Sequence, residues 1–152
     1  MEEVWLEQFD STENSIHFED FPETPSEWRD EELHNKWLTI RRVRKVVTGA
    51  LEVKRQDKTI GASLEAAPIV FVKEKDKEIL DSVDFQDICI TSGIELSLSE
   101  IPKNAYVLDD VSEVGVVFEL ARGNKCQRCW KVLPEVGYQA RLDVCQRCNE
   151  AL

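Results

Sequence analysis

The chain has 152 residues, 42% of them hydrophobic, and a formal net charge of −11 at pH 7. This length suits one modest domain with a small appendage, the apolar content argues against a wholly disordered chain, and the acidity argues against a protein that coats nucleic acid by bulk charge. No apolar run reaches the roughly 20 residues of a membrane helix, and the acidic N-terminus lacks a signal-peptide pattern, so we expect a cytoplasmic protein without membrane contact.

A long amphipathic helix of roughly 25–30 residues is predicted to end near Asp57. Apolar residues recur in it at spacings of three and four, and they are Leu33, Trp37, Ile40, Val43, Val47, Ala50 and Leu51. Its start is open, because Thr24 begins a capping-box pattern with Glu27 whereas Asp30 could cap a helix one turn later. Ahead of it, residues 15–25 are predicted to be extended, and residues 2–9 could end an earlier helix.

The middle of the chain has the pattern of a small sheet. Residues 69–72, 87–91 and 114–120 are predicted strands, and the charged segment 73–81 is a predicted short helix. The fold class is therefore α+β, with the long amphipathic helix packed against a small β-sheet. Cys89 lies in the second predicted strand, and we expect a small core residue there rather than a nucleophile.

Four cysteines near the C-terminus follow the pattern C-x2-C-x15-C-x2-C. They are Cys126, Cys129, Cys145 and Cys148. Two such pairs form knuckles that supply a closed tetrahedron of thiolates, so the spacing predicts one structural Zn²⁺ per chain. Two disulfides, or reduced cysteines without metal, are the alternatives, and a reducing compartment favours zinc over both. A segment this short depends on the metal for its stability.

Basic residues gather in two places despite the acidic total. Residues 36–58 carry a net charge of +6 and residues 122–152 a net charge of +3, whereas residues 1–35 carry −11. The tail places Trp130 directly after the first knuckle, among Lys125, Arg128, Lys131, Arg141 and Arg147. Cations beside an exposed aromatic ring suit a single-stranded RNA loop. Alternatively the arginines screen the thiolates, Trp130 packs the knuckle, and the basic helix is a solvated face.

Taken together, several segments resemble the C-terminal region of bacterial-type isoleucyl-tRNA synthetases. They are residues 15–22 (SIHFEDFP), the helix positions Trp37, Leu38, Arg41, Val43, Leu51 and Glu52, residues 60–66 (IGASLEA), and the tail with KCQRCW at 125–130, Gly137 and VCQRC at 144–148. The resemblance implies three parts: the helical end of the anticodon-binding domain at 1–60, a small α/β junction at 61–122, and a four-cysteine zinc-ribbon or knuckle module at 123–152.

The same resemblance implies a tRNA-binding part of a class I aminoacyl-tRNA synthetase, which attaches isoleucine to tRNA(Ile) using ATP. The implied partners are the tRNA(Ile) anticodon stem-loop and the catalytic and editing domains of the same chain, in a monomeric protein. Arg128 and Trp130 are the implied base-proximal pair. The implied phosphate contacts are Arg41, Arg42, Arg44 and Lys45.

Two other functions compete with this interpretation. The chain could be a freestanding zinc-ribbon adaptor that binds another protein through its acidic N-terminal block. An enzyme in its own right is disfavoured, because His17 and His34 are far apart in sequence and no nucleophile–base grouping or phosphate loop is visible. The sequence also contains neither of the two nucleotide-binding signatures of the synthetase family, so we expect the isolated chain to catalyse nothing.

Overall fold

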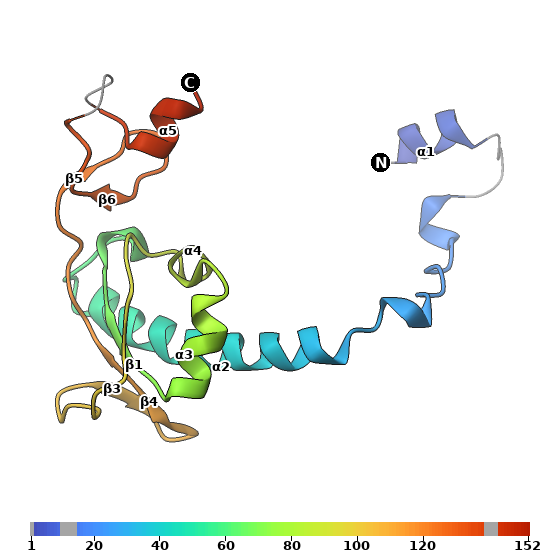
Figure 1. Cartoon of the computed structure of the whole chain (residues 1–152). Coiled ribbons are helices and arrows are strands. Elements are labelled where there is room, and N and C mark those ends of the chain that lie inside the picture. Colours follow the sequence, from blue (N-terminus) through green and yellow to red (C-terminus); the bar gives the residue numbers. More distant parts are fainter. Residues whose placement is uncertain (1, 10–14, 139–142) are drawn as a thin grey trace. The chain divides into compact units, whose positions relative to one another are not determined.

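A computed structural model describes residues 2–9, 15–138 and 143–152 (Figure 1). The chain divides into two compact units, Met1–Glu31 and Glu32–Leu152. The second unit contains a long helix, a four-stranded sheet and a terminal cluster of cysteines, so the predicted α+β class is confirmed. Among the described residues, no helix combines the length and the apolar character needed to cross a membrane.

The N-terminal unit consists of short helical segments. Helix α1 spans Glu2–Gln8, and the 3₁₀ turns η1 and η2 span Ile16–Phe18 and Ser26–Trp28. Ser15 caps η1, because its Oγ accepts a hydrogen bond from the His17 amide at 3.2 Å. The prediction that residues 15–25 are uniformly extended is therefore wrong at its N-terminal end, where a serine cap favours a turn.

The long helix α2 spans Glu31–Gln56, so its predicted end near Asp57 is confirmed. It starts directly after Asp30, the later of the two starts that the sequence left open. Thr24 does not begin it, because Arg29 has an extended backbone (φ −78°, ψ 114°) between the η2 turn and the helix. A residue in that conformation interrupts the hydrogen-bond ladder that a helix starting at Thr24 would need.

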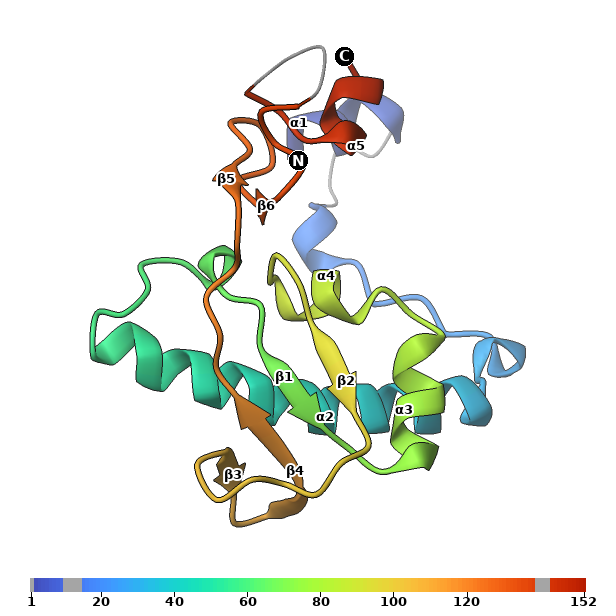
Figure 2. The ribbon, with the colours of Figure 1, turned by 60° about the vertical axis from the view of Figure 1, so that its left-hand side comes forward.

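The four-stranded sheet has the strand order β2-β1-β4-β3, with β1 at Ile69–Phe71, β2 at Glu95–Ser97, β3 at Tyr106–Leu108 and β4 at Val111–Val117. Strand β1 pairs in parallel with β2 and antiparallel with β4, and β3 and β4 form an antiparallel hairpin. Figure 2 shows α2 running across one face of this sheet. The predicted strands at 69–72 and 114–120 correspond to β1 and β4.

One apolar core joins α2 to the sheet. The helix contributes Ile40, Val43, Val46, Val47, Ala50 and Leu51, and the strands contribute Val70, Val114 and Val116. Gly49 has a packing role in this helix, because a Cβ there would lie 2.7 Å from the hydroxyl oxygen of Tyr106. Close approach of the tyrosine ring therefore compensates for the low helix propensity of glycine. Leu33 and Trp37, which were predicted on the buried face, are exposed.

Residues 87–91 are not a strand, which corrects the prediction. Helix α4 spans Phe85–Cys89, and it follows helix α3 at Glu74–Asp81, which matches the predicted short helix. The Asp84 carboxylate caps α4 by accepting from the Asp87 amide at 3.2 Å, and Ile90 ends it in a left-handed conformation with φ 57°. A short apolar run fits either element, and here the aspartate cap decides for a helix.

Beyond the sheet, the chain forms a small terminal module. It contains the two-stranded ribbon of β5 (Asn124–Lys125) and β6 (Val132–Leu133), followed by helix α5 at Gln146–Glu150. The remaining 3₁₀ turn, η3 at Ser63–Glu65, lies in the IGASLEA segment. An isolated bridge pairs Ala66 with Leu120, so this segment lies beside the strand end that leads into the module.

Arg42 connects α2 to both α3 and β4. Its guanidinium forms ion pairs with Asp76, at 2.7 Å, and with Glu113. Asp76 is only 7% exposed and lies in the core-facing side of α3. A carboxylate with so little access to water needs a partner of this kind, because removing the partner leaves an uncompensated charge.

We therefore expect Arg42→Ala to lower the free energy of unfolding by about 1–3 kcal/mol. Lys45→Ala is the matched control on the same helix, because it removes the solvent-exposed ion pair with Asp110 and should cost much less. Urea denaturation of the two variants measures both changes. If Arg42→Ala lowers the free energy of unfolding no more than Lys45→Ala does, the ion pairs of Arg42 do not contribute specially to the stability of the fold.

Cys89 is expected to be chemically inert in the folded protein. Its thiol lies in the core at 2% exposure, and burial raises its pKa to about 12, although the charge of Arg44 acts in the opposite direction. Only the thiolate reacts with alkylating reagents. Iodoacetamide at pH 8 should leave Cys89 unmodified until urea unfolds the protein, as peptide mass spectrometry can measure. Modification of Cys89 under native conditions would contradict this placement.

Candidate metal centre and nucleic-acid interface

The two C-x2-C pairs lie at the turns of the terminal module. The first knuckle, with Cys126 and Cys129, connects β5 to β6, and the second, with Cys145 and Cys148, includes the start of α5. Gly123 leads into the ribbon with φ 117°, where a Cβ would come within 2.3 Å of the Leu133 carbonyl. The chain can enter the module this close to β6 only because residue 123 has no side chain.

All four cysteine sulfurs converge on one point. Their Sγ atoms lie within 4.8 Å of one another, and those of Cys129 and Cys145 are 3.7 Å apart. A tetrahedral Zn²⁺ with Zn–S distances of about 2.3 Å separates its sulfurs by about 3.8 Å. A disulfide needs about 2.05 Å, so this pair is not one. The four sulfurs therefore fit a metal ion, and a closed set of four soft ligands is typical of Zn²⁺.

Burial and hydrogen bonding act in opposite directions on the thiols. Burial raises the pKa of Cys129 to about 12 and also raises the pKa of Cys145. It acts in the same direction on Cys126, but there the backbone amides of Cys129, Cys145 and Arg128 outweigh it and lower the pKa to about 6. Holding the sulfurs of Cys129 and Cys145 as thiolates near neutral pH therefore requires a cation beside them.

The apolar core of the module is very small. Among the described residues, its buried members are Val136 and Val144 beside Cys126, Cys145 and Cys148, with Leu133 packed at the edge. Two valines and the edge of a leucine cannot offset the conformational entropy of fixing about 25 residues. The sulfur cluster is therefore the main source of stability that this segment has.

Trp130 lies on the surface of the first knuckle. Its side chain is 61% exposed, its backbone has the left-handed φ of 66°, and its amide donates to the Cys126 carbonyl at 2.9 Å. The Lys125 ammonium lies 5.4 Å from the centre of the ring, which is a cation–π distance. The ring does not pack into the core of the module, so the alternative that Trp130 serves to pack the knuckle has little support.

The basic side chains of the module differ in their surroundings. The Arg128 side chain is exposed and has no hydrogen-bond or ion-pair partner within the described part of the chain. Lys131 and Arg147 both contact the carboxylate of Asp87 on α4. Arg141 lies outside the described residues. Unlike Lys131 and Arg147, Arg128 therefore has no carboxylate opposite its charge among the described residues.

The four residues of α2 that are predicted to contact phosphates are not equivalent either. Arg42 is bound by Asp76 and Glu113, as described above. Arg44 donates from Nε to the Ile88 carbonyl at 2.9 Å, and Lys45 pairs with Asp110 at 2.6 Å. The Arg41 side chain is exposed, and no hydrogen-bond or ion-pair partner is found for it among residues 2–9, 15–138 and 143–152. Their assignment as phosphate contacts stays a prediction, and it is simplest for Arg41.

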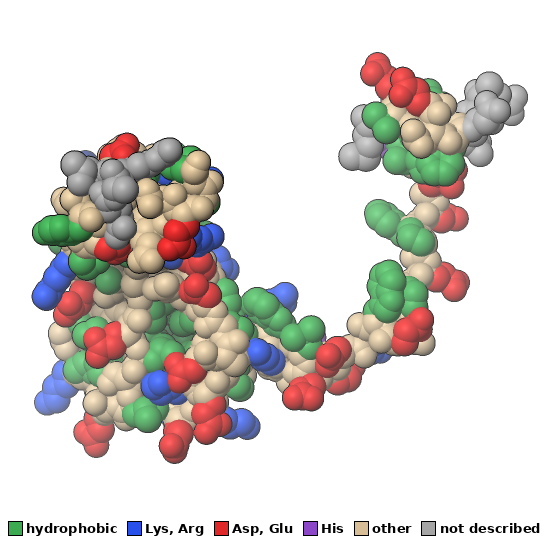
Figure 3. All heavy atoms as spheres, turned by 45° about the horizontal axis from the view of Figure 1, so that its top comes forward, with side chains coloured by type: hydrophobic (Ala, Val, Ile, Leu, Met, Phe, Trp, Pro, Cys, Tyr) green, Lys and Arg blue, Asp and Glu red, His purple; other side chains and the backbone are tan. Residues whose placement is uncertain are grey.

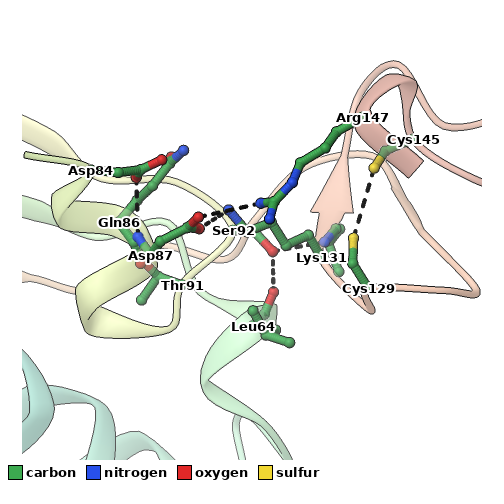
Figure 4. A network of polar contacts seen from close by, with 11 residues as sticks. Leu64, Asp84, Gln86, Asp87, Thr91, Ser92, Cys129, Lys131, Cys145 and Arg147 are labelled. Atoms are coloured by element: carbon green, nitrogen blue, oxygen red, sulfur yellow. Dashed lines mark hydrogen bonds and ion pairs between the residues drawn. The ribbon is translucent and has the colours of Figure 1, made fainter. Parts of the chain in front are cut away.

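Figure 4 shows contacts between the module and the α/β core that the sequence analysis missed. Besides the Asp87 pairs, the Ser92 hydroxyl accepts from the Val132 amide at 2.7 Å and donates to the Leu64 carbonyl. The Lys131–Asp87 and Val132–Ser92 partners are 44 and 40 residues apart in sequence, and a single serine or aspartate carries no motif. Only the fold brings them together.

The chain was compared with known proteins. No family model matches it. It is 51% identical to the isoleucine–tRNA ligase of Ruegeria pomeroyi over 153 aligned positions, which cover all of this chain and 16% of that ligase. The isoleucine–tRNA ligases of Brucella abortus and Bartonella henselae are 51% and 48% identical over 138 positions, or 90% of this chain and 14% of theirs.

The chain thus spans about one sixth of the length of the curated relatives that it matches. Identity near 50% over nine tenths or more of the chain is far above what chance produces, and it confirms the resemblance drawn from the sequence. The chain therefore belongs with the isoleucine–tRNA ligases, as the homologue of a C-terminal region of theirs.

Proposed function

We propose that this chain is the tRNA-binding C-terminal part of an isoleucine–tRNA ligase and that its terminal module binds one structural Zn²⁺. The observation that carries the proposal is the exposed Trp130 ring on the first knuckle of the four-sulfur module, in a chain about 50% identical to isoleucine–tRNA ligases. The parent enzyme would attach isoleucine to tRNA(Ile) with ATP, and its other domains would carry that chemistry. This part would catalyse nothing alone.

The module offers a stacking surface of the kind that single-stranded RNA loops bind. A base in an anticodon loop can unstack and lie on an aromatic ring, while its phosphates pair with nearby cations. Trp130 supplies the ring, Lys125 supplies a cation over it, and the exposed Arg128 lies two positions earlier in the chain. The anticodon loop of tRNA(Ile) is therefore the proposed ligand of this surface, with the α2 residue Arg41 as a further phosphate contact.

The N-terminal unit supports a second set of partners, the remaining domains of the same ligase. Phe18, Phe21 and Trp28 are exposed by 81%, 99% and 74%, and acidic residues separate them. Figure 3 shows mostly acidic and hydrophobic side chains along this unit. Exposed aromatic rings on such a segment are typical of a contact surface. We propose that the parts of the ligase outside this chain cover it.

The zinc proposal predicts one Zn²⁺ per chain. Cys148→Ser should abolish stoichiometric zinc, whereas Cys89→Ala should retain it, because Cys89 is not a ligand. Native mass spectrometry measures both. Chelation should unfold residues 124–148 and leave α2 intact, since only the module depends on the metal. Two disulfides in freshly purified protein, or zinc retained by Cys148→Ser, would contradict the proposed site.

Arg128 and Trp130 should contribute to RNA binding in different ways. In the full-length ligase, Arg128→Ala should reduce the slope of log affinity against log salt for the anticodon stem-loop by about one unit, because one phosphate contact is lost. Trp130→Ala should leave the slope nearly unchanged and weaken binding by about 1–3 kcal/mol, because a stacked base is lost.

Zinc content distinguishes this role of Trp130 from a structural one. The proposal expects Trp130→Ala to keep one zinc per chain, since the ring is exposed and the sulfurs do not depend on it. If the variant keeps wild-type RNA affinity but loses zinc, Trp130 is structural and the proposed recognition surface is wrong.

A further inference from the structure

The terminal module is held on the α/β core by a small polar junction (Figure 4). We propose that Asp87 and Ser92 form an intramolecular docking site for the assembled four-cysteine module and act as positioning residues for Arg128 and Trp130. The docking itself stands on the contacts below. Its consequence for RNA binding rests on the proposed function.

Asp87 receives one cation from each knuckle. Lys131, two residues after Cys129, pairs with its Oδ1, and Arg147, directly before Cys148, approaches its Oδ2 at 3.4 Å. The two cations lie 16 positions apart in sequence and reach the same carboxylate only when both knuckles are assembled. Lys131 is the stronger contact, because its side chain is only 15% exposed whereas that of Arg147 is largely in solvent.

Ser92 forms the second half of the junction. Its residue is buried, and its hydroxyl accepts from the Val132 amide of β6 while donating to the Leu64 carbonyl of η3. Its own amide donates to the Ala66 carbonyl at 3.0 Å. One side chain therefore links the zinc-module ribbon to the IGASLEA segment, with its hydroxyl used both as donor and as acceptor.

The IGASLEA segment also fixes the start of the module. The Glu65 carbonyl accepts from the Ala121 amide at 2.8 Å, and the Glu65 carboxylate accepts from the Gly61 amide at 2.9 Å. The segment therefore holds Ser92 on one side and the chain entering the module on the other. Together with Asp87, this gives attachments at three points: the entry strand, the ribbon, and the two knuckles.

Three attachments are enough to fix the orientation of a rigid body on the core. The direction in which Trp130 and Arg128 face is then set by contacts that neither residue makes. Loss of the Asp87 charge should free the module without disturbing its sulfur cluster, because the carboxylate is not a metal ligand and its amide, not its side chain, takes part in the α4 cap.

Amide hydrogen exchange tests the docking directly in the zinc-loaded protein. Asp87→Asn does not touch the hydrogen bond between Val132 and Ser92, so faster exchange at the Val132 amide reports release of the whole module. We expect a rise of about three- to tenfold, as for a charged contact of intermediate burial. Asp81→Asn, which removes the exposed pair with Lys77, is the matched control and should change nothing at Val132.

A second amide separates undocking from unfolding. The Cys126 amide donates to the Lys131 carbonyl inside the module, so its exchange should stay at the wild-type rate in Asp87→Asn. Adding Lys131→Gln should raise exchange at Val132 no further than Asp87→Asn alone, since both act on one contact. Unchanged exchange at Val132, or an equal rise at Cys126, would overturn the docking proposal.

The positioning role is tested in the full-length ligase with Asp87→Asn combined with Ser92→Ala. ¹⁵N relaxation of the zinc-loaded chain should show this module tumbling independently, with one zinc per chain. Stem-loop affinity should then fall at least threefold, and wild-type affinity with a freed module would overturn the role. If the wild-type ligase binds the stem-loop equally well without its terminal module, the proposed function is wrong. The docking proposal is then still decided by amide exchange at Val132.

Discussion

Convergence of four sulfurs on one point is the constraint on which the end of this chain depends. Among its described residues, the module has two buried valines and a two-stranded ribbon of two-residue strands, which is too little apolar surface to order such a segment. A metal ion bound by the sulfurs would close a loop of about twenty residues and remove its conformational freedom at the same time. The sulfur cluster is therefore what this segment has in place of a large apolar core.

The part of the fold with strong local signals was predictable. The apolar spacing of α2, the β-branched run of β1 and the charged segment of α3 each specify one element. The prediction of a strand at 87–91 was wrong, because the apolar residues Ile88, Cys89 and Ile90 fit a buried strand as well as a helix. The Asp84 cap, three residues before Asp87, was the signal that could have corrected it. Strands β2 and β3 have three residues each and leave almost no pattern.

The candidate site was predictable in its ligands and much less so in its surroundings. The spacing alone identified the four cysteines as candidate metal ligands, because two C-x2-C pairs at this interval are typical of a zinc site. Exposure of Trp130 and the nearness of Lys125 depend on the backbone turn at residue 130, which composition does not encode. The contacts of Asp87 with Lys131 and of Ser92 with Val132 join segments 44 and 40 residues apart, so they follow from tertiary structure only.

An acidic chain can still present a cation to RNA if its own carboxylates are placed to engage some cations and not others. On α2, Asp76 and Glu113 hold Arg42, and Asp110 holds Lys45, while Arg41 faces solvent. In the module, Asp87 holds Lys131 and Arg147.

Such pairing divides the basic residues into two groups with different tasks. The basic residues that form ion pairs stabilise the geometry of the protein, because carboxylates of the same chain neutralise their charges at short range. Cations that have no carboxylate partner among the described residues, such as Arg128, two positions before Trp130, and Arg41 on α2, keep the long-range attraction that a phosphate backbone would feel. Net charge is therefore a poor guide to RNA binding here, since what counts is which cations the fold leaves unneutralised.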